Sequence, residues 1–466
     1  MPGLDLRDRA IAFGVGEPGA EHGRALRKQA PRTSLAELIA ADRTATEILV
    51  DQNRSRLPEL VGLRFARMLV SPLSFYRGAA AVMAADLAAG PTSNIEVMSC
   101  GDAHLSNFGV FATPDRALVF DLNDFDEAAM APAEWDLKRL VTSAILGARQ
   151  LKFPETAVSD IANTTVVTYR DALTAMMQMS VIDRFYLRAE PIKQSNLVSG
   201  AFGAVIDRTV QRARKRTSGR AFAKLTEIDA DGIPRFRESP PMTRHVPLSD
   251  ETELLRAVEE YMTSVAADAR LLLAHFRVTD IAMRVVGVGS IGTRCYLAAL
   301  VDSRGTPLIL QIKEAKRSVL QEYGKRTQLP LLTAAIAARG EGRRVVIGQR
   351  ILQSMSDRLL GTVRAEGADF YLRQFHDMKG SVDLGDLNAE TFAEYAGGCA
   401  AVLARAHAQS ANAEILRGYF GGGSKALDAV VTWCYRYADK TVDDFDQLTA
   451  AARDGDIEVA ADPQLK

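Results

Sequence analysis

The 466-residue chain contains little cysteine, almost no net charge and no long apolar run. Its four cysteines (Cys100, Cys295, Cys399 and Cys434) lie far apart, and no two of them form a CxxC pair. This pattern is typical of free, buried thiols in a reducing cytosol rather than of a disulfide framework. The formal net charge of −1 gives no bulk attraction to nucleic acid or to a membrane surface, so we expect neither partner.

No stretch approaches the roughly 20 consecutive apolar residues that a membrane-spanning helix needs. The N-terminal residues lack the apolar segment of a secretory signal peptide. Residues 1–30, rich in glycine and charge, are predicted to form a flexible lead-in. We therefore expect a cytoplasmic protein, and the sequence leaves its oligomeric state open.

What the chain does contain is an ordinary globular composition, with 47% hydrophobic and 25% charged residues, which is enough for a large core. Helix-like segments such as EWDLKRLVTSAILGARQL (134–151) alternate irregularly with short strand-like ones. This irregularity favours an α+β protein of two lobes over a doubly wound sheet. The expected organisation is a mainly helical segment (31–280), a strand-rich segment (281–380) and C-terminal helices (381–466) that return to the first lobe.

An acidic stretch, MSCGDAHLSNFGVFATPDRALVFDLNDFDEA (98–128), carries six carboxylates between Asp102 and Glu127 but only one cation, Arg116. Large apolar residues separate the acids, and buried carboxylates are costly unless they are paired or bound to a metal. Three interpretations remain: acids that cap helices and decorate loops, a metal-dependent hydrolase that uses Asp102, His104 and the later aspartates, and a phosphotransfer site.

Residue spacing favours phosphotransfer. Asp102 and Asn107 fit the D-x-x-x-x-N pattern of kinase catalytic loops, in which the Asp orients the substrate hydroxyl and accepts its proton. The Asn and a later Asp hold Mg²⁺ on the nucleotide phosphates. Asp121 and Asp124 both qualify as that later Asp. Asp124 precedes Phe125, as in the DFG arrangement, and is slightly favoured, whereas Asp121 fits the usual loop length better.

The segment CGDAHLSN resembles the HGD-x-H-x-x-N loop of aminoglycoside and choline phosphotransferases, a branch of the protein-kinase-like superfamily. It matches at Gly101, Asp102, His104 and Asn107, and it departs at Cys100, where that branch usually has a supporting His. The resemblance implies catalytic roles for Asp102 and His104, although an isolated histidine is more often a packing residue than a ligand.

A glycine-rich stretch supplies the phosphate-covering loop that a kinase needs. Gly287, Gly289 and Gly292 satisfy G-x-G-x-x-G. A dinucleotide-binding turn would continue into a long helix, but TRCYLAAL lasts only eight residues before a turn signal. A Walker A loop would place Lys where Thr293 stands. The kinase arrangement needs a second strand and then a third strand that carries Lys, and Lys313 ends such a strand.

Two further elements complete this prediction. Glu322 is the candidate partner of Lys313, in the role of the helix glutamate that holds a kinase lysine. The strand-like segment 369–375 would join the two lobes, and residues 373–378 would meet the adenine.

The motif order is the reverse of that in ordinary kinases, because Gly287 follows Asp102 by 185 residues (287 minus 102). Either one motif is a coincidence or the fold is circularly permuted, which is physically cheap when the termini lie close together at the surface. The segment GGCAAVLARAHAQS (397–410) resembles the L-A-x-x-H helix that precedes the catalytic loop in small-molecule kinases. Joining it to the N-terminal helices would restore the usual order.

Segments along nearly the whole chain from about residue 23, among them RFARMLVSPLSFYRGAAAVMAADLA and DFYLRQFHDMKGS, look like an uncharacterised bacterial family, domain of unknown function 2252. The sequence thus predicts a permuted protein-kinase-like phosphotransferase that uses ATP and Mg²⁺, with 31–280 as catalytic lobe and 281–380 as nucleotide-binding lobe. The acceptor is an unknown hydroxyl compound. AMP transfer, a metal-dependent phosphohydrolase centred on 102–126 and a non-catalytic nucleotide-binding pseudokinase stay open.

Overall fold

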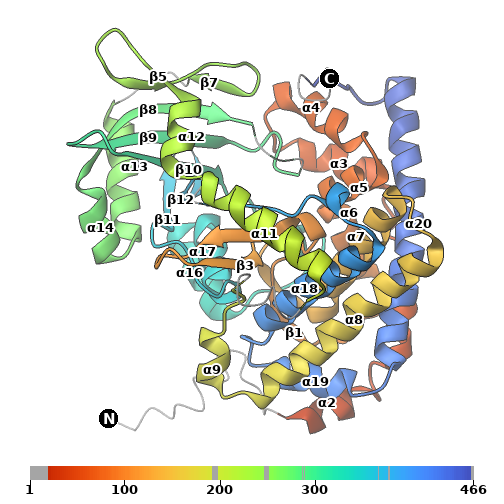
Figure 1. The fold of residues 1–466 in the computed structure, drawn as a ribbon. Coiled ribbons are helices and arrows are strands. Elements are labelled where there is room, and N and C mark those ends of the chain that lie inside the picture. Colours follow the sequence, from red (N-terminus) through yellow and green to blue (C-terminus); the bar gives the residue numbers. More distant parts are fainter. Residues whose placement is uncertain are drawn as a thin grey trace.

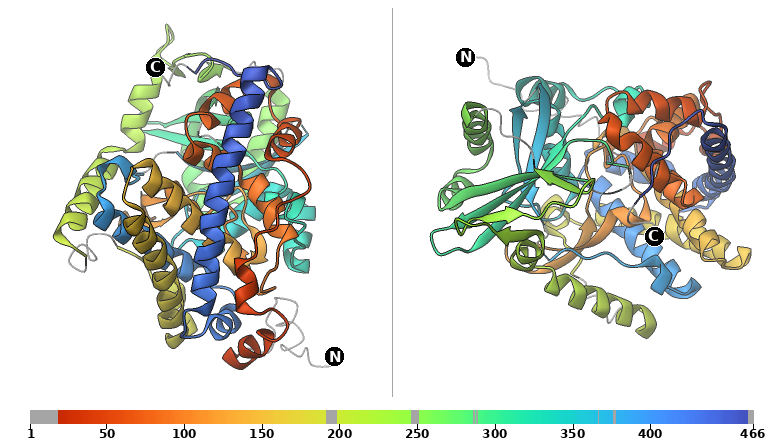
Figure 2. Two further views of the ribbon diagram at one scale, coloured as in Figure 1. Left: turned by 90° about the vertical axis from the view of Figure 1, so that its right-hand side faces the viewer. Right: turned by 90° about the horizontal axis from the view of Figure 1, so that it is seen from above.

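The computed structural model describes residues 19–190, 198–245, 251–285, 287, 289–365, 367–375 and 378–462. An antiparallel sheet with its own helices occupies one part of the molecule, and a larger helical part lies beside it (Figures 1 and 2). This arrangement is a mixed α and β fold, as the irregular alternation in the sequence predicted.

The sheet has six antiparallel strands in the order β11-β12-β10-β9-β8-β7. The glycine-rich stretch joins the neighbouring strands β8 and β9, and Lys313 of β10 lies opposite Cys295 of β9 and Tyr371 of β12. The expected sheet, with strands near 283–301, 307–313 and 369–375, is confirmed. The strand bounds are β7 (Thr243–His245), β8 (Phe276–Arg284), β9 (Cys295–Asp302), β10 (Pro307–Glu314), β11 (Gly361–Ala365) and β12 (Ala368–Gln374).

Helices cover both faces of this sheet. On one face, α13 (Glu251–Ser264) and α14 (Ala267–Leu273) share a core with alternate residues of the strands, including Leu300, Leu310 and Phe370. On the other face, α12 (Ser218–Leu225) and the β5–β6 hairpin (Thr226–Ile228 and Pro234–Phe236) pack on Leu297 and Ile309. Because β7, α12 and α13 precede residue 281, the sheet part begins earlier than the expected boundary.

The helical part has a core that the two ends of the chain build together. Helix α7 (Ala133–Gln150) is buried over almost its whole length, including its charged residues Glu134, Asp136, Lys138 and Arg139. It packs against α8 (Glu155–Gln178), α18 (Ala389–His407) and the 30-residue α20 (Lys425–Asp454), which runs along one side of the molecule (Figure 2). The C-terminal helices therefore return to the N-terminal half.

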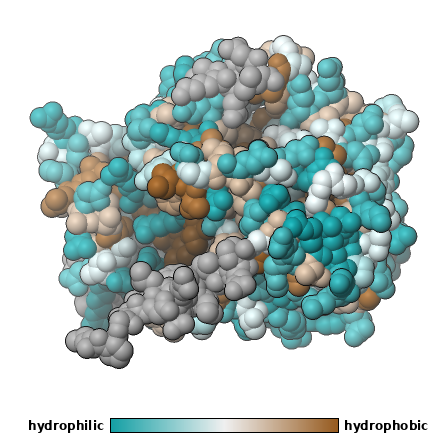
Figure 3. Space-filling view, turned by 90° about the horizontal axis from the view of Figure 1, so that it is seen from below, coloured by the Kyte–Doolittle hydropathy of each residue, from teal (hydrophilic) through white to brown (hydrophobic). Residues whose placement is uncertain are grey.

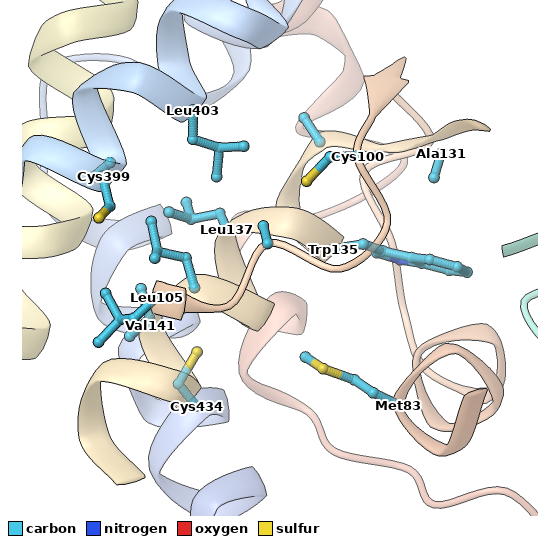
Figure 4. Packing of buried hydrophobic residues seen from close by; sticks show 14 of the residues in the cluster. Met83, Cys100, Leu105, Ala131, Trp135, Leu137, Val141, Cys399, Leu403 and Cys434 are labelled. Atoms are coloured by element: carbon cyan, nitrogen blue, oxygen red, sulfur yellow. The ribbon is translucent and has the colours of Figure 1, made fainter. Parts of the chain in front are cut away.

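Figure 4 shows the centre of this core, where Cys100, Cys399 and Cys434 lie among Leu137, Val141 and Leu403. All four cysteines are free and buried, as the sequence predicted.

The remaining helices of the described residues are α2 (Ala20–Leu26), α3 (Ala45–Asn53), α4 (Pro58–Met68), α5 (Pro72–Gly78), α6 (Ala80–Ala89), α9 (Val181–Tyr186), α11 (Gly200–Lys215), α15 (Val319–Glu322), α16 (Pro330–Arg339), α17 (Glu341–Leu352) and α19 (Ala413–Phe420), with short 3₁₀ turns η1 (Arg32–Ala36), η2 (Leu105–Asn107) and η4 (Leu384–Asp386).

The acidic stretch folds into two small hairpin-like pairs. β2 (Phe108–Ala112) pairs with β3 (Leu118–Leu122) across the ATPDR turn, while β1 (Glu96–Ser99) pairs with β4 (Ala129–Pro132). The second pairing brings Gly101 against Glu127. A Cβ on Gly101 would lie 2.3 Å from the Glu127 carbonyl oxygen, and φ there is +80°. Only glycine allows this close approach, which places both ends of the stretch side by side.

Part of the expected lead-in is ordered. Residues 1–18 lie outside the described residues, but Ala20–Leu26 forms α2, which packs so closely on α19 that a Cβ on Gly23 would clash with the Ile415 carbonyl oxygen.

Within the described residues, no helix is both long and apolar enough to cross a membrane. Seen from below, the surface shows apolar patches within a hydrophilic surround (Figure 3), and α9 exposes Val181, Ile182, Phe185 and Tyr186.

Candidate functional site

The two sequence motifs meet at one cleft between the sheet and the helical part. The Lys313 Nζ on β10 lies 2.5 Å from the Asp126 Oδ2 and 3.9 Å from the Asp124 Oδ2. The neighbouring cavity is lined by the acidic stretch (Asp102, Asp124, Asp126 and Glu127), by the glycine-rich stretch (Gly289, Ser290 and Thr293) and by Glu314 and Glu322. Residues almost two hundred positions apart in the sequence therefore form one site.

Lys313 is buried and has a different partner from the one expected. Within the described part of the chain, its ion pairs are with Asp126 and Asp124, whereas Glu322 lines the cavity without pairing to it. Tyr371, opposite Lys313 in the sheet, donates its hydroxyl to the Asp126 Oδ1 at 2.6 Å. Burial lowers the pKa of Lys313, but the two aspartates outweigh burial and raise it well above the ordinary value, so the ammonium stays charged.

The loop that carries Asp102 is held from below by Asp136 of α7. The backbone N–H groups of Cys100 and Gly101 donate to its two carboxylate oxygens at 2.7 and 3.0 Å. His407 of α18 contacts the same carboxylate through its Nε2 at 3.2 Å, and its Nδ1 is hydrogen-bonded to the Tyr169 hydroxyl at 2.7 Å. Asp136 thus fixes the loop backbone directly, and Cys100 packs as an apolar residue where the resembled loop has His.

Asp102 points into the cleft and is paired with Arg139 of α7. The Arg139 Nε donates to the Asp102 Oδ1 at 2.9 Å, and the same guanidinium lies over the Tyr76 ring. Burial raises the pKa of Asp102, and the Arg139 charge limits the increase. A carboxylate held in this way can accept a proton from a hydroxyl placed in the cleft.

His104 is buried beside Asp102 but forms no hydrogen bond with it. Its Nε2 lies 3.7 Å from the Asp102 Oδ2, which is beyond hydrogen-bond length. Its Nδ1 has no hydrogen-bond partner among the described residues. Burial, together with Arg77 and Arg139, lowers the pKa of His104 well below its ordinary value. The ring is therefore neutral and packs behind the loop, whose Leu105 N–H donates to Ser143.

The metal-ligand candidates separate in space. Asp124 lines the cleft, and although burial alone would raise its pKa, the charges of Lys313 and Arg373 hold it below the ordinary value. The Asn107 side-chain amide donates to the Asp102 carbonyl at 2.8 Å, which ties it to the loop. Among the described residues, no group of three or more His, Cys, Asp or Glu side chains converges as a metal site would.

Asp121 lies away from this cleft. Its Oδ2 accepts from the Ser354 backbone N–H at 2.8 Å and from the Ser354 hydroxyl at 2.7 Å, and its Oδ1 accepts from the Leu122 N–H. Burial raises its pKa, and Arg405 opposes the increase. These contacts make Asp121 an anchor between β3 and the residues that follow α17. Because its oxygens already accept hydrogen bonds there, they argue against the metal-ligand role that the sequence left open.

The glycine-rich stretch is tied to the N-terminal helices. Gly287 and Gly292 have φ of +76° and +85°, which favour glycine. The Leu57 N–H donates to the Gly292 carbonyl at 2.7 Å, Arg56 donates to the Ile291 carbonyl and Arg67 to the Gly287 carbonyl. Val286 and Val288 lie outside the described residues. The cavity beneath has a volume of about 90 Å³, below the roughly 300 Å³ of a small-ligand pocket.

A second cavity of about 230 Å³ lies at the end of β12. Asn123, Arg373, Gln374 and Lys379 line it. Burial and the charge of Arg373 lower the pKa of Lys379 to about 7. The predicted adenine contact at 373–378 falls partly here, but His376 and Asp377 lie outside the described residues. The Gly380 N–H donates to the Val110 carbonyl, so the chain passes from the sheet to the helical part at this point.

Sequence reasoning missed several residues of this site: Asp126, Tyr371, Asp136 and Arg139. Asp126 was visible as an acid in the same stretch, and Tyr371 as the cross-strand neighbour of Lys313 once the register is known. Asp136 and Arg139 lie in EWDLKRL, where the charged side chains of the helix are themselves buried. Charges at buried positions of a helix are the signal that could have identified them.

Comparison with known proteins yields one match. No curated protein and no solved structure matches the chain. The family described as "Uncharacterized protein conserved in bacteria (DUF2252)" matches residues 56–451. That range includes the acidic stretch, the glycine-rich stretch and Lys313, and it covers far more than half of the chain. The chain is therefore a member of the DUF2252 family of bacterial proteins.

Proposed function

We propose that this protein is an ATP- and Mg²⁺-dependent phosphotransferase with a permuted, protein-kinase-like arrangement. The observation that carries the proposal is the contact of Lys313 with Asp126 and Asp124. A glycine turn between two strands, a lysine on the next strand and an acidic loop are the parts that kinases use around the nucleotide phosphates. A metal-dependent hydrolase needs neither the glycine turn nor the lysine, so this convergence favours phosphotransfer.

Each residue of the cleft has a role in this proposal. Asp102 orients the acceptor hydroxyl and accepts its proton, and its pairing with Arg139 keeps the carboxylate in one position. Lys313 contacts the nucleotide phosphates after leaving Asp126. The backbone of 287–292 covers those phosphates, and adenine lies in the second cavity, against Gln374 at the end of β12.

The residues present fit Mg²⁺ that arrives with a nucleotide. Mg²⁺ in such sites is held by one or two carboxylates together with substrate phosphates, rather than by a cage of protein ligands. Asp124 is the carboxylate that would hold it, with Asn107 on the neighbouring loop, in preference to Asp121, whose oxygens already accept from Ser354 and Leu122. The metal would neutralise charge on the transferring phosphoryl group.

The same geometry supports the proposed permutation. Helix α18, which ends on His407, supports the catalytic loop through Asp136, and the Tyr395 hydroxyl of α18 donates to the Leu105 carbonyl. In a chain that began at the glycine-rich stretch, the order would be glycine turn, Lys313, β12, α18, catalytic loop and Asp124. This is the usual kinase order.

Nucleotide binding and turnover test the proposal. Millimolar MgATP should raise the thermal midpoint, because a ligand at a hundredfold excess over its Kd adds about 2.7 kcal/mol of stability. Lys313→Ala should remove most of this gain, whereas Lys425→Ala, which removes an exposed lysine at the start of α20, should leave it unchanged. Incubation with a cell extract and mass analysis of the products then separate phosphate transfer from AMP transfer. An unchanged midpoint in folded wild-type protein would refute the proposal.

A further inference from the structure

The catalytic cleft contains cations that neither the motifs nor the proposed function use. Arg56, after α3, and Arg77, on α5, line the cavity together with Asp102 and Asp124. Both come from the N-terminal helical segment (α3 to α5), outside the segments that resemble kinase motifs. Lys316 and Arg317 line the same cavity from the strand side. The wall that faces the acidic stretch is therefore basic.

Arg77 is the least satisfied of these groups. Across the described residues its side chain makes no hydrogen bond and no ion pair, and its Nε is buried without a partner. It is near enough to Asp102 for that carboxylate to act on its charge. The Arg77 backbone carbonyl also lies close to Gly289, 3.4 Å from where a Cβ would stand. Arg77 thus sits between the proposed base and the glycine-rich stretch.

Arg56 has a similar environment. Its Nη1 donates to the Ile291 carbonyl at 2.5 Å, but its Nε is buried without a partner in the described part of the chain. Burial lowers the pKa of Arg56 to about 10, with Glu127 and Glu314 opposing it, and burial lowers that of Arg77 as well. Lys316, in contrast, donates to the Ser55 carbonyl and lies 3.9 Å from Glu314.

A third arginine holds the two in place. Arg64 of α4 is fully buried, and its guanidinium donates to the Asn53 and Gln52 side chains and to the Gly78 carbonyl. These partners lie at the end of α3, just before Arg56, and at the end of α5, just after Arg77. Arg64 therefore holds the backbone beside Arg56 and Arg77 before any ligand binds, and such preorganisation reduces the entropy cost of binding.

Among the described residues, no acid of the cleft forms an ion pair with either of these two arginines. Asp102 is paired with Arg139, and Asp126 with Lys313. Glu127 accepts from the Val319 N–H, and burial raises its pKa to about 7. A partly buried cation that is not paired with a carboxylate is unfavourable, so the free protein holds two charges that a bound anion would neutralise.

We propose that Arg56 and Arg77 form a phosphate-binding subsite beside Asp102. The planar guanidinium donates two parallel hydrogen bonds, which matches the geometry of a phosphate. The inference rests on the proposed function, within which the phosphate has two possible sources: the terminal phosphate of the nucleotide, or a phosphate group carried by the acceptor. Both present the same chemistry to the two arginines.

Titration with inorganic tripolyphosphate, followed by calorimetry, tests the subsite without turnover. Arg77→Gln and Arg56→Gln should each weaken binding about tenfold or more, because a charge-assisted pair of hydrogen bonds is lost. Arg77→Lys should bind with intermediate affinity. Arg54→Gln is the matched control, because Arg54 lies on the same segment, pairs with Asp51 and has a side chain that is 80% exposed. It should bind as the wild type does.

Two further titrations identify the source. If Arg77→Gln weakens MgATP but not MgADP, the ligand is the terminal phosphate of the nucleotide. If it leaves MgATP unchanged but abolishes the binding of inorganic phosphate to the MgADP complex, the ligand is a phosphate on the acceptor. Wild-type affinity of the arginine variants for tripolyphosphate, MgATP and phosphate, all within twofold, would overturn the subsite. Loss of tripolyphosphate binding in protein that binds no nucleotide would support the subsite and reject the phosphotransferase.

The stability of the ligand-free variant separates a binding role from a structural one. Arg77→Gln should raise the thermal midpoint on the order of 1–2 °C, because it removes a partly buried charge that is not paired with a carboxylate. An arginine that merely supported the fold would lower the midpoint when replaced. A lower midpoint combined with unchanged tripolyphosphate affinity would therefore count against the subsite.

Discussion

Asp121 and Asp124 are three residues apart, and both are carboxylates within an apolar stretch, yet their surroundings are opposite. Both Asp121 side-chain oxygens accept hydrogen bonds, one from Ser354 and the other from the Leu122 amide, so the chain itself supplies the partners of this carboxylate. Asp124 faces the cleft, near Lys313 but not in hydrogen-bond contact with it. A buried acid whose hydrogen bonds are complete supports structure, whereas one that is held charged in a cleft has capacity left for a ligand.

The largest expected effect concerns Asp124, the carboxylate that faces the cleft. Asp124→Asn keeps the side-chain shape but removes the charge that would hold Mg²⁺. Nucleotide turnover at 1 mM Mg²⁺ should fall on the order of 10²-fold or more, since preorganised electrostatic groups at reaction centres contribute about that much. Raising the Mg²⁺ concentration should restore part of the activity. A Mg²⁺ titration of turnover measures this.

Asp231→Asn, in the exposed β5–β6 turn, is the control for that substitution and should titrate as the wild type does. If Asp121→Asn shifts the Mg²⁺ requirement and Asp124→Asn does not, the two assignments must be exchanged.

The next largest effect concerns Asp121, the carboxylate that supports the structure. Asp121→Asn should lower the free energy of unfolding by about 1–3 kcal/mol, because an amide cannot accept from all of the donors that now surround the carboxylate. Turnover per folded molecule should be unchanged. Urea unfolding measures the first quantity and an assay at saturating Mg²⁺ the second. A variant as stable as the wild type would show that the Ser354 contacts contribute little.

The smallest effect is a difference in pH dependence. Asp124 has a folded-state pKa below its ordinary value of about 3.9, so its contribution to stability is present above that pH and is lost as the pH falls through the folded pKa. Asp121 has a raised pKa, so it favours the folded state more as the pH falls from its folded pKa toward the ordinary one.

Unfolding free energies of the wild type and both Asn variants between pH 7 and 3 test this difference. The gap between wild type and Asp121→Asn should change above about pH 4, and the gap for Asp124→Asn only below it. Parallel curves for the two variants would show that their environments are alike.

The sequence predicted the parts of the site whose signals are local. The strand and turn pattern placed Lys313 and the glycine turn in one sheet, and the D-x-x-x-x-N spacing placed Asp102 and Asn107 on one loop. The partner of Lys313 could not be predicted, because Asp126 and Glu322 are both acids near an expected cleft and only the approach of the sheet to the helical part decides between them. For the same reason the sequence could not separate Asp121 from Asp124, since their difference depends on where Ser354 lies.

Arg56 and Arg77 show a second limit. Arginines on or between amphipathic helices are ordinarily solvent-exposed, so nothing in the pattern of residues 45–89 marks Arg56 and Arg77 as facing a cleft. Their role depends on a tertiary contact, the docking of the N-terminal helices against the glycine-rich stretch, which no local periodicity encodes.

That docking links the binding of a nucleotide to the binding of any partner of the N-terminal helices. The cavity is small, and the Leu57 amide, Arg56 and Arg67 hold the glycine-rich stretch from the side of α4. A nucleotide that displaces the glycine-rich stretch must break these contacts. The binding of the nucleotide and the binding of a partner to the N-terminal helices are then linked equilibria. By reciprocity, a molecule that draws α4 away changes nucleotide affinity by the same factor by which the nucleotide changes the affinity of that molecule.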